Sequence, residues 1–227
     1  MALLKKHLGV IISILIITAW FGMLSISLQW EVTYTSLLLP LFILVQSHLY
    51  TGLFITAHDA MHGVVSPSNP KLNKAIGTFS ALLFAFNFYH RLLPKHHEHH
   101  KYVATNKDPD YAEKGFFGWY LKFLMEYVNW KQIVLMAITF NILKLYIPQE
   151  NLLLFWIAPS FLATMQLFYF GTYLPHRGEH DANNKHKARS QSKNHLWAFL
   201  SCYFFGYHYE HHNTSWVPWW KLYQQKQ

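Results

Sequence analysis

Two long apolar runs near the N-terminus restrict the folds that are open to this chain. Leu8–Leu28 and Ser36–Ala57 each have about 20 residues, the length that a helix needs to cross a bilayer. Only 13% of the 227 residues are charged, whereas a soluble domain carries about 25%. We therefore predict an all-α integral membrane protein that forms a single domain over residues 1–227.

The first run is expected to be a membrane span and not a cleaved signal. It is longer than the roughly 7–15 residues of a signal-peptide core, and no small-x-small cleavage site follows it. Lys5 and Lys6 precede it and favour a cytoplasmic N-terminus, because positive residues stay on the cytoplasmic side. The chain then turns at Gln29–Thr35 and returns to the cytoplasm at His58.

Later apolar segments complete a predicted set of four transmembrane helices. Trp130–Ile147 and Leu152–Leu174 are expected to span as an antiparallel pair. Ala75–Tyr89 is short and flanked by basic residues, which predicts a re-entrant or interfacial segment. Phe116–Val128 is aromatic-rich and is expected along the interface, and Leu196–Tyr207 is too short to span. The histidine-rich connections then form a cytoplasmic helical cap.

Histidines recur in three spaced clusters at the ends of the apolar segments. The spacing His-x-x-His-His occurs twice and a pair four residues apart occurs once, in His96, His99, His100, His208, His211, His212, His58 and His62. Positions i, i+3 and i+4 share one helix face, so each cluster is expected to point its imidazoles toward one place. Neutral imidazole is the commonest metal ligand among side chains. The pattern predicts a polynuclear metal site, with His176 after the last span as a further ligand.

This set of histidines exceeds what one ion needs. Four nitrogens fill a tetrahedral site, so eight or nine indicate two ions with about four or five ligands each. Cys202 is the single cysteine, so the histidines must carry any metal chemistry. Imidazole alone does not choose among iron, copper, nickel and zinc. A site under apolar helices suits oxidation of a lipophilic substrate by oxygen, which favours di-iron.

Residues around these nine histidines have predicted roles of their own. A surface or supporting role is expected for the remaining histidines considered: His7, His48, His90, His97, His180, His186 and His195. Metal-bound histidine usually donates its other N–H to a carboxylate. Asp59 and Asp108 are predicted to accept these bonds, whereas Asp110 and Glu210 are expected to be solvent-exposed.

Segments around the three clusters match a known family pattern. The segments are Thr56–Gly63, His96–His100 with Asp108–Asp110, Phe170–His176, Phe205–His212 and Trp216–Trp220. They resemble the histidine boxes of the membrane di-iron superfamily of desaturases, hydroxylases and carotenoid oxygenases, and within it the bacterial β-carotene ketolases. The resemblance extends from about residue 36 to the C-terminus and implies that the nine histidines hold two iron ions.

The resemblance also implies a reaction. C4 of a β-ionone ring would be oxidised to a ketone, giving echinenone and canthaxanthin from β-carotene by two hydroxylations and loss of water. This scheme needs dioxygen and electrons, and no Gly-x-Gly-x-x-Gly nucleotide pattern is present. A ferredoxin or similar external carrier is therefore expected. An acidic electron donor would suit the net charge of +8 and the basic stretch with Lys185, Lys187, Arg189 and Lys193. The usual retention of positive residues on the cytoplasmic side of a membrane protein explains the same charges equally well.

The substrate is expected to enter sideways from the bilayer. Eight aromatic residues are candidates to line its channel, although ordinary membrane packing is the favoured expectation for any single one: Phe79, Phe84, Phe86, Phe88, Tyr89, Phe168, Tyr169 and Phe170. A fatty-acid desaturase or hydroxylase of the same superfamily stays open as an alternative, with a narrower, kinked channel. A metal transporter or sensor is disfavoured, because the predicted spans carry no line of polar residues across the membrane.

Overall fold

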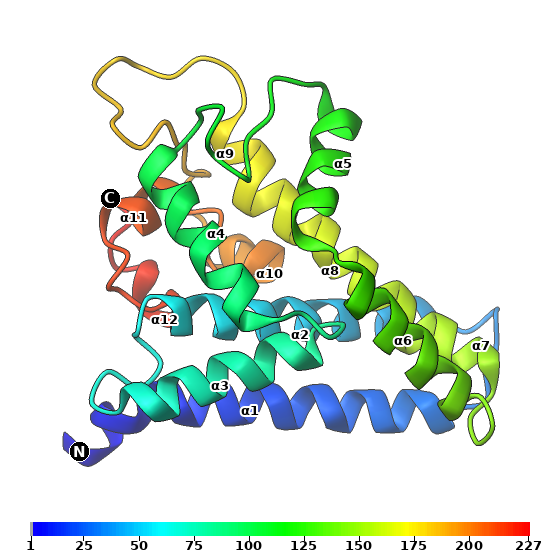
Figure 1. Ribbon diagram of the computed structural model, residues 1–227. Coiled ribbons are helices and arrows are strands. Elements are labelled where there is room, and N and C mark those ends of the chain that lie inside the picture. Colours follow the sequence, from blue (N-terminus) through cyan, green and yellow to red (C-terminus); the bar gives the residue numbers. More distant parts are fainter. Residues whose placement is uncertain (1) are drawn as a thin grey trace.

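Helices make up the regular structure of residues 2–227, the part of the chain that the structure describes, with side chains from His7 onward. In this computed structural model the described residues contain α- and π-helices and no strand, which confirms the predicted all-α class. The helix ends that carry histidines gather at one end of the molecule. The loops before α2 (Leu38–Met61) and after α6 (Trp130–Leu143) lie at the other end (Figure 1).

Three helical segments among the described residues are long and apolar enough to cross a membrane: His7–Gln29 of α1 (Ala2–Gln29), α2, and Gln149–His176. α1 and α2 lie side by side and run in opposite directions (Figure 1). The third segment joins α7 (Gln149–Leu152), η1 (Leu153–Ile157), α8 (Ala158–Phe168), η2 (Tyr169–Tyr173) and α9 (Leu174–His176). These segments enclose a core that includes Trp20, Tyr50, Leu53 and Leu167.

Helix α6 is shorter than the span predicted over Trp130–Ile147. It has 14 residues, which cover roughly 21 Å against a bilayer core of about 30 Å. Hydrogen-bonded turns follow from Lys144 to Ile147, and Pro148 then breaks the chain direction before α7. The structure therefore gives three segments of spanning length and a shorter apolar helix beside the third.

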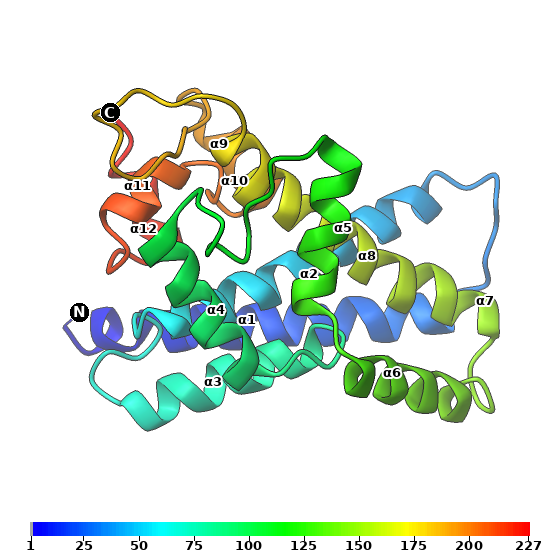
Figure 2. The ribbon, with the colours of Figure 1, turned by 45° about the horizontal axis from the view of Figure 1, so that its top comes forward.

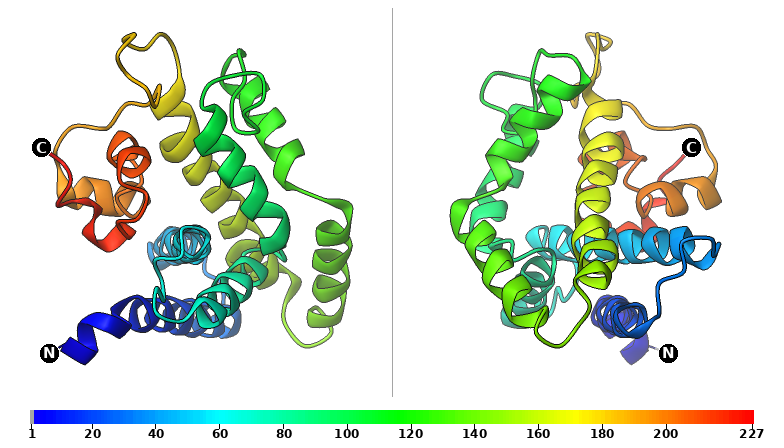
Figure 3. Two further views of the ribbon diagram at one scale, coloured as in Figure 1. Left: turned by 60° about the vertical axis from the view of Figure 1, so that its left-hand side comes forward. Right: turned by 90° about the vertical axis from the view of Figure 1, so that its right-hand side faces the viewer.

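Helices α3 (Pro70–Leu83) and α4 (Tyr89–Tyr102) form an inward hairpin beside α2. α3 starts next to the end of α2, where Asn73 Nδ2 donates to the carbonyl oxygen of Ala60 at 2.7 Å. It ends at the middle of α2, where the rings of Phe84 and Tyr50 lie 5.8 Å apart. α4 then returns toward the histidine-bearing end (Figure 3). The re-entrant or interfacial placement of Ala75–Tyr89 stays a prediction.

Short helices cover the histidine-bearing end. α5 (Phe116–Tyr127) packs on the third spanning segment through Trp119, Phe123 and Phe168. α10 (His195–Cys202) has eight residues and ends at Tyr203 in a left-handed conformation. α11 (His208–Asn213) and α12 (Trp219–Leu222) follow and lie near α4 and the end of α2 (Figure 2).

Asn73→Ala is expected to destabilise the junction between α2 and α3. Asn73 is 6% exposed, and besides bonding Ala60 it accepts from the backbone N–H of Ser66 at 3.1 Å. Leaving two buried partners unpaired costs on the order of 1–3 kcal/mol each, so the melting temperature of the protein in detergent should fall. Thr78→Val on the exposed face of α3 is the control and should melt like the wild type. An unchanged melting temperature for Asn73→Ala would contradict this role.

Candidate metal centre

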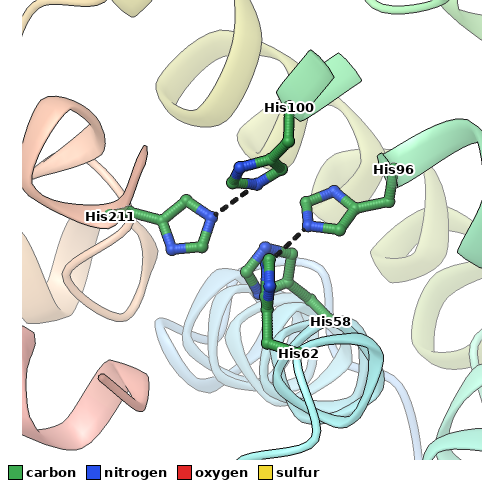
Figure 4. Close-up of side chains that lie close together, drawn as sticks. All are labelled: His58, His62, His96, His100 and His211. Carbon is green, nitrogen blue, oxygen red and sulfur yellow. Dashed lines mark hydrogen bonds between the residues drawn. The ribbon is translucent and has the colours of Figure 1, made fainter. Parts of the chain in front are cut away.

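Nine histidines form two adjacent groups at one end of the molecule. One group contains five residues: His58, His62, His96, His100 and His211 (Figure 4). The other group contains four: His99, His176, His208 and His212. Within each group, one ring nitrogen of every member lies within 4.8 Å of those of all the others. The structure thus brings together all nine histidines that the sequence singled out.

The ends of four helical segments deliver these side chains. His58 lies in the last turn of α2, and His62 is its C-cap residue. Gly63 follows with φ of +75°, a left-handed conformation that glycine adopts without steric cost. The turn at Gly63 therefore ends α2 immediately after His62. α4 and α11 each carry three of the nine histidines, and His176 closes the third spanning segment.

Each His-x-x-His-His cluster serves both groups, so the prediction of one shared target per cluster is wrong. On α4, His99 joins the four-histidine group while the other two join the five-histidine group. On α11, His211 alone joins the five-histidine group. Residues i+3 and i+4 point about 100° apart around a helix, so they face different centres. The stacked rings of His100 and His212, 4.2 Å apart, lie between the two groups.

The spacing of the ring nitrogens fits ligands around metal ions. Nε2 atoms approach closely in four pairs: His62 and His96 at 2.7 Å, His99 and His212 at 3.2 Å, His100 and His211 at 3.1 Å, and His208 and His212 at 3.0 Å. Nitrogens bonded to one metal at about 2.0–2.1 Å lie roughly 2.8–3.4 Å apart for near-right and tetrahedral angles, so three of the pairs have that spacing and His62 and His96 are slightly closer. The buried Nε2 atoms of His58 and His176 have no hydrogen-bond partner, although buried polar atoms are nearly always satisfied. Both groups therefore fit a metal ion.

Burial favours the neutral form of most of these imidazoles. It lowers the pKa of His62 to about 4, with a smaller contribution from His97. Burial, followed by the neighbouring histidines, also lowers the pKa of four further members well below the usual value: His96, His208, His211 and His212. Metals bind the neutral form of histidine, so these side chains need lose no proton at neutral pH to become ligands.

Asp108 holds His99 in place. Its two carboxylate oxygens lie 2.9 and 3.1 Å from Nδ1 of His99, which leaves Nε2 directed at the four-histidine group. Backbone N–H groups of Ala104 and Asp110 donate to the same carboxylate. Burial would raise the pKa of Asp108, but His99 and these amides lower it overall. Burial likewise opposes the charged form of His99, whereas Asp110 and Asp108 raise its pKa overall.

Helix α5 clamps the loop that carries Asp108. The indole N–H of Trp119 donates to the carbonyl oxygen of Asp110. Nζ of Lys122 donates to the carbonyl oxygens of residues 108, 109 and 111, and the hydroxyl of Tyr127 donates to the Asp110 carboxylate. These contacts fix both carboxylates beside His99.

Two further contacts orient histidines from behind. Asp59 lies 3.3 Å from Nδ1 of His58 and accepts from the backbone N–H of Trp219 at 2.9 Å. Nδ1 of His176 lies 2.8 Å from the carbonyl oxygen of Lys187 and is placed to donate to it. Asp59 therefore contacts a histidine of the five-histidine group, and Asp108 contacts a histidine of the four-histidine group. Each contact is made at the ring nitrogen that faces away from the group centre.

Asp110 and Glu210 are largely buried, so the prediction that they are solvent-exposed is wrong. The Asp110 side chain is 13% exposed and lies 3.9 Å from Nδ1 of His99. Burial raises the pKa of Asp110, and Asp108 adds to this while His99 opposes it. The Glu210 side chain is 12% exposed and accepts from Ser190 and Lys226. Histidine spacing carries no information on the loop and the tail that cover these carboxylates.

The remaining histidines stay outside both groups. His7, His90, His97 and His195 are exposed. His48 is half-buried in α2, where its ring stacks on Tyr203 at 4.3 Å. His186 comes nearest to the ligand set, with its ring 5.8 Å from that of His212 and its Nε2 3.4 Å from Asn213. His180 lies 3.3 Å from the carbonyl oxygen of His176.

An apolar cavity of about 480 Å³ lies between α2, α5, α6 and α8. A smaller pocket of about 40 Å³ adjoins it, and four histidines from both groups line this pocket: His58, His96, His99 and His208. Five side chains line both spaces: Phe54, Leu92, Phe123, Tyr127 and Leu167. We call these five residues the passage. They form the boundary that the apolar cavity shares with the small pocket beside the histidines.

A π-helical turn shapes the wall of the small pocket. η2 places Gly171 on this wall, and a Cβ there would lie 2.6 Å from the ring of Phe205. Glycine therefore lets Phe205 approach closely. The Phe205 ring in turn packs against His58 at 4.7 Å and His208 at 5.2 Å.

Of the eight aromatic candidates for the channel lining, Phe84 alone lines the cavity. Phe168 packs instead against Trp119 and Phe123, and Tyr169 and Phe170 line a separate surface groove. The other seven do not line it, as the packing alternative expects, because the cavity is walled mainly by α5, α6 and α8. The packing of those helices is set by tertiary contacts that aromatic content does not reveal.

Comparison with known proteins shows which family the chain belongs to. The profile of the family described as fatty acid desaturase matches residues 33–151 and 128–227. A β-carotene ketolase of Paracoccus sp. (strain N81106 / MBIC 01143) is 41% identical over 177 residues, which are 77% of this chain and 73% of that protein.

Two algal proteins extend the comparison. The zeaxanthin 4-ketolase of Chlamydomonas reinhardtii is 34% identical over 94% of this chain and 52% of its own length. The β-carotene 4-ketolase 3 of Haematococcus lacustris is 38% identical over 79% of this chain and 59% of its own. No solved structure matches the chain. The chain belongs to the fatty acid desaturase family, within the branch that contains the β-carotene ketolases.

Proposed function

We propose that this protein is a β-carotene ketolase, an oxidoreductase that introduces a keto group at C4 of the β-ionone ring and converts β-carotene to echinenone and canthaxanthin. One observation carries the proposal. Histidines of two groups line a small pocket that adjoins an apolar cavity, in a chain 41% identical to β-carotene ketolases. We take residues 1–227 as a single oxygenase domain.

The proposed cofactors are two iron ions, one in each histidine group. The ligands would be His58, His62, His96, His100 and His211 for one ion and His99, His176, His208 and His212 for the other. When bound, such a centre supplies the activation of dioxygen that oxidation of an inert C–H bond requires. The protein contributes neutral imidazoles. Asp59 and Asp108, the proposed supporting carboxylates, orient two of them.

The cavity suits one end of a long hydrocarbon. Its lining is almost entirely apolar, with exposed side chains such as Ile133 and Phe161 at its edge. A ring entering from the bilayer would pass between Phe54, Leu92 and Leu167 to reach the pocket beside the histidines. Apolar walls exclude water from that pocket, so the reacting carbon is kept from bulk solvent.

We place the protein in the inner membrane with the histidine groups on the cytoplasmic side, as a helical cap. Lys5 and Lys6 before the first span support that orientation. We further propose that α6 makes a fourth crossing beside the third spanning segment. Its exposed apolar side chains support a lipid-facing position: Trp130, Ile133, Val134, Ile138 and Ile142.

Electrons are proposed to come from an acidic electron-transfer protein such as a ferredoxin. The loop from Arg177 to Lys193 exposes several cations: Arg177, Lys185, Lys187, Arg189 and Lys193. Complementary charge speeds the encounter of such partners. The same loop contacts the ligand set directly, because the carbonyl oxygen of Lys187 accepts from His176. A carrier docked there would lie next to the four-histidine group.

Expression in bacteria that accumulate β-carotene should yield echinenone and canthaxanthin under aerobic, iron-replete conditions. His99→Ala and His211→Ala should each reduce ketone formation to background, because each removes a ligand from one group. His97→Ala should keep full activity, since His97 is an exposed neighbour on the same helix. Pigment chromatography gives the result, and absence of any ketocarotenoid from the wild type would refute the proposed function.

Metal analysis should find about two iron ions per purified chain, because the ligands divide into two sets of at least four. His176→Ala should retain about one iron, since it leaves the five-histidine group complete. His90→Ala, which alters an exposed histidine, should retain both ions. About one zinc and no iron per chain, or an unchanged iron content in His176→Ala, would contradict the assignment.

Asp108→Asn should weaken the four-histidine group selectively. The amide can turn its NH₂ toward His99, and the charged acceptor that fixes this ring is lost. Loss of such a partner typically costs about 10–100-fold in metal affinity. Competition with a chelator measures the effect, and Asp181→Asn in the exposed loop serves as control. Equal affinities for the two variants would contradict the supporting role of Asp108.

A further inference from the structure

Tyr127 brings a hydroxyl group to the passage between the cavity and the histidines. It lines both the cavity and the small pocket, while its four companions in the passage are hydrocarbon side chains. The same small pocket is lined by histidines of both groups. A ring whose C4 lies at the histidines therefore passes next to the Tyr127 side chain.

Contacts on three sides hold Tyr127 in one orientation. Its hydroxyl donates to a carboxylate oxygen of Asp110. Its ring packs against that of Phe123 at 4.8 Å. Nζ of Lys95 lies 5.5 Å from the ring centroid and pairs with Glu126. The phenolic oxygen keeps lone pairs that can accept one more hydrogen bond, and the other four residues of the passage have no polar side-chain atom.

The proposed reaction creates a need for such an acceptor. The first hydroxylation consumes dioxygen, two electrons and two protons, and it converts the C4 methylene to an alcohol with release of one water. The second repeats this at the same carbon, and the geminal diol loses water to leave the ketone. The external electron carrier supplies four electrons per ring. Between the two oxidations the substrate carries a hydroxyl group, which is costly to leave unpaired in an apolar site.

We propose that Tyr127, oriented by Asp110, accepts a hydrogen bond from the 4-hydroxy intermediate and retains it until the second oxidation. The inference rests on the proposed ketolase function. The bond discriminates between intermediate and product, because an alcohol donates a proton and a ketone has none to donate. Because the Tyr127 hydroxyl donates its own proton to Asp110, its oxygen can accept a hydrogen bond from the alcohol and has no proton to donate to the ketone. Tyr127 therefore retains the alcohol and releases the ketone.

Tyr127→Phe tests this by product distribution. The variant removes a single oxygen atom and should raise the ratio of 4-hydroxy to 4-keto rings severalfold among the pigments of β-carotene-producing cells. Tyr120→Phe on the same helix is the control, because Tyr120 lines neither the cavity nor the pocket. A wild-type ratio in Tyr127→Phe overturns the inference and leaves the ketolase function standing. A wild type that oxidises no ring refutes the function itself.

Direct binding gives a readout that does not depend on turnover. The zinc-loaded protein is titrated with β-carotene and with its 4-hydroxy derivative, and the polyene absorbance is followed. Loss of one hydrogen bond should weaken binding of the alcohol by about three- to tenfold in Tyr127→Phe, with β-carotene binding unchanged. Equal weakening of both ligands indicates a merely structural role and overturns the inference.

A wild-type experiment covers the case in which Tyr127→Phe does not fold. Isotopically labelled β-carotene is converted in the presence of excess unlabelled 4-hydroxy-β-carotene. If the 4-hydroxy intermediate stays bound between the two oxidations, ketone formed from labelled β-carotene keeps its full label. Labelled alcohol then does not accumulate. Labelled alcohol that accumulates freely in the membrane before any ketone forms overturns the inference.

Discussion

The structure depends on the convergence of nine imidazole rings whose ring nitrogens approach to about the separation found around a metal ion. Uncharged lone pairs buried face to face repel one another and have lost their water, which is unfavourable unless something binds them. Four helix ends must therefore meet with a fixed rotation about each helix axis. The turn at Gly63, the return of α4 from the middle of α2, and the short α11 each serve that convergence.

Residues outside the two groups fix the orientation of three of the histidine rings. α5 grips the loop 108–111 through Trp119, Lys122 and Tyr127, and that loop fixes His99. The tail fixes His58 through the bond from Trp219 to Asp59, and the basic loop fixes His176. Each of these contacts leaves Nε2 directed inward. α5 also walls the cavity, so one helix both supports the loop that holds His99 and lines the apolar cavity.

The sequence reveals the nine histidines that converge, because their spacing repeats the helix period at the ends of apolar segments. It does not reveal that each triplet divides between two groups, since this depends on how α4 and α11 are rotated against each other. Nearness to histidines in the sequence singles out Asp59, Asp108, Asp110 and Glu210 as a set, and it does not show which of them contact histidine rings. The burial of Asp110 and Glu210 arises from contacts with Tyr127 on α5 and with Lys226 in the tail. The cavity lining and the short α6 likewise follow from packing and turns that periodicity does not encode.

X-ray absorption at the iron edge of the purified, iron-loaded protein tests the central claim most directly. The account predicts a first coordination shell dominated by imidazole nitrogen, with the multiple-scattering pattern of histidine rings and an iron-to-chain ratio matching two sites. A shell dominated by carboxylate oxygen or by sulfur, or an edge from a single zinc with no iron, would contradict the account.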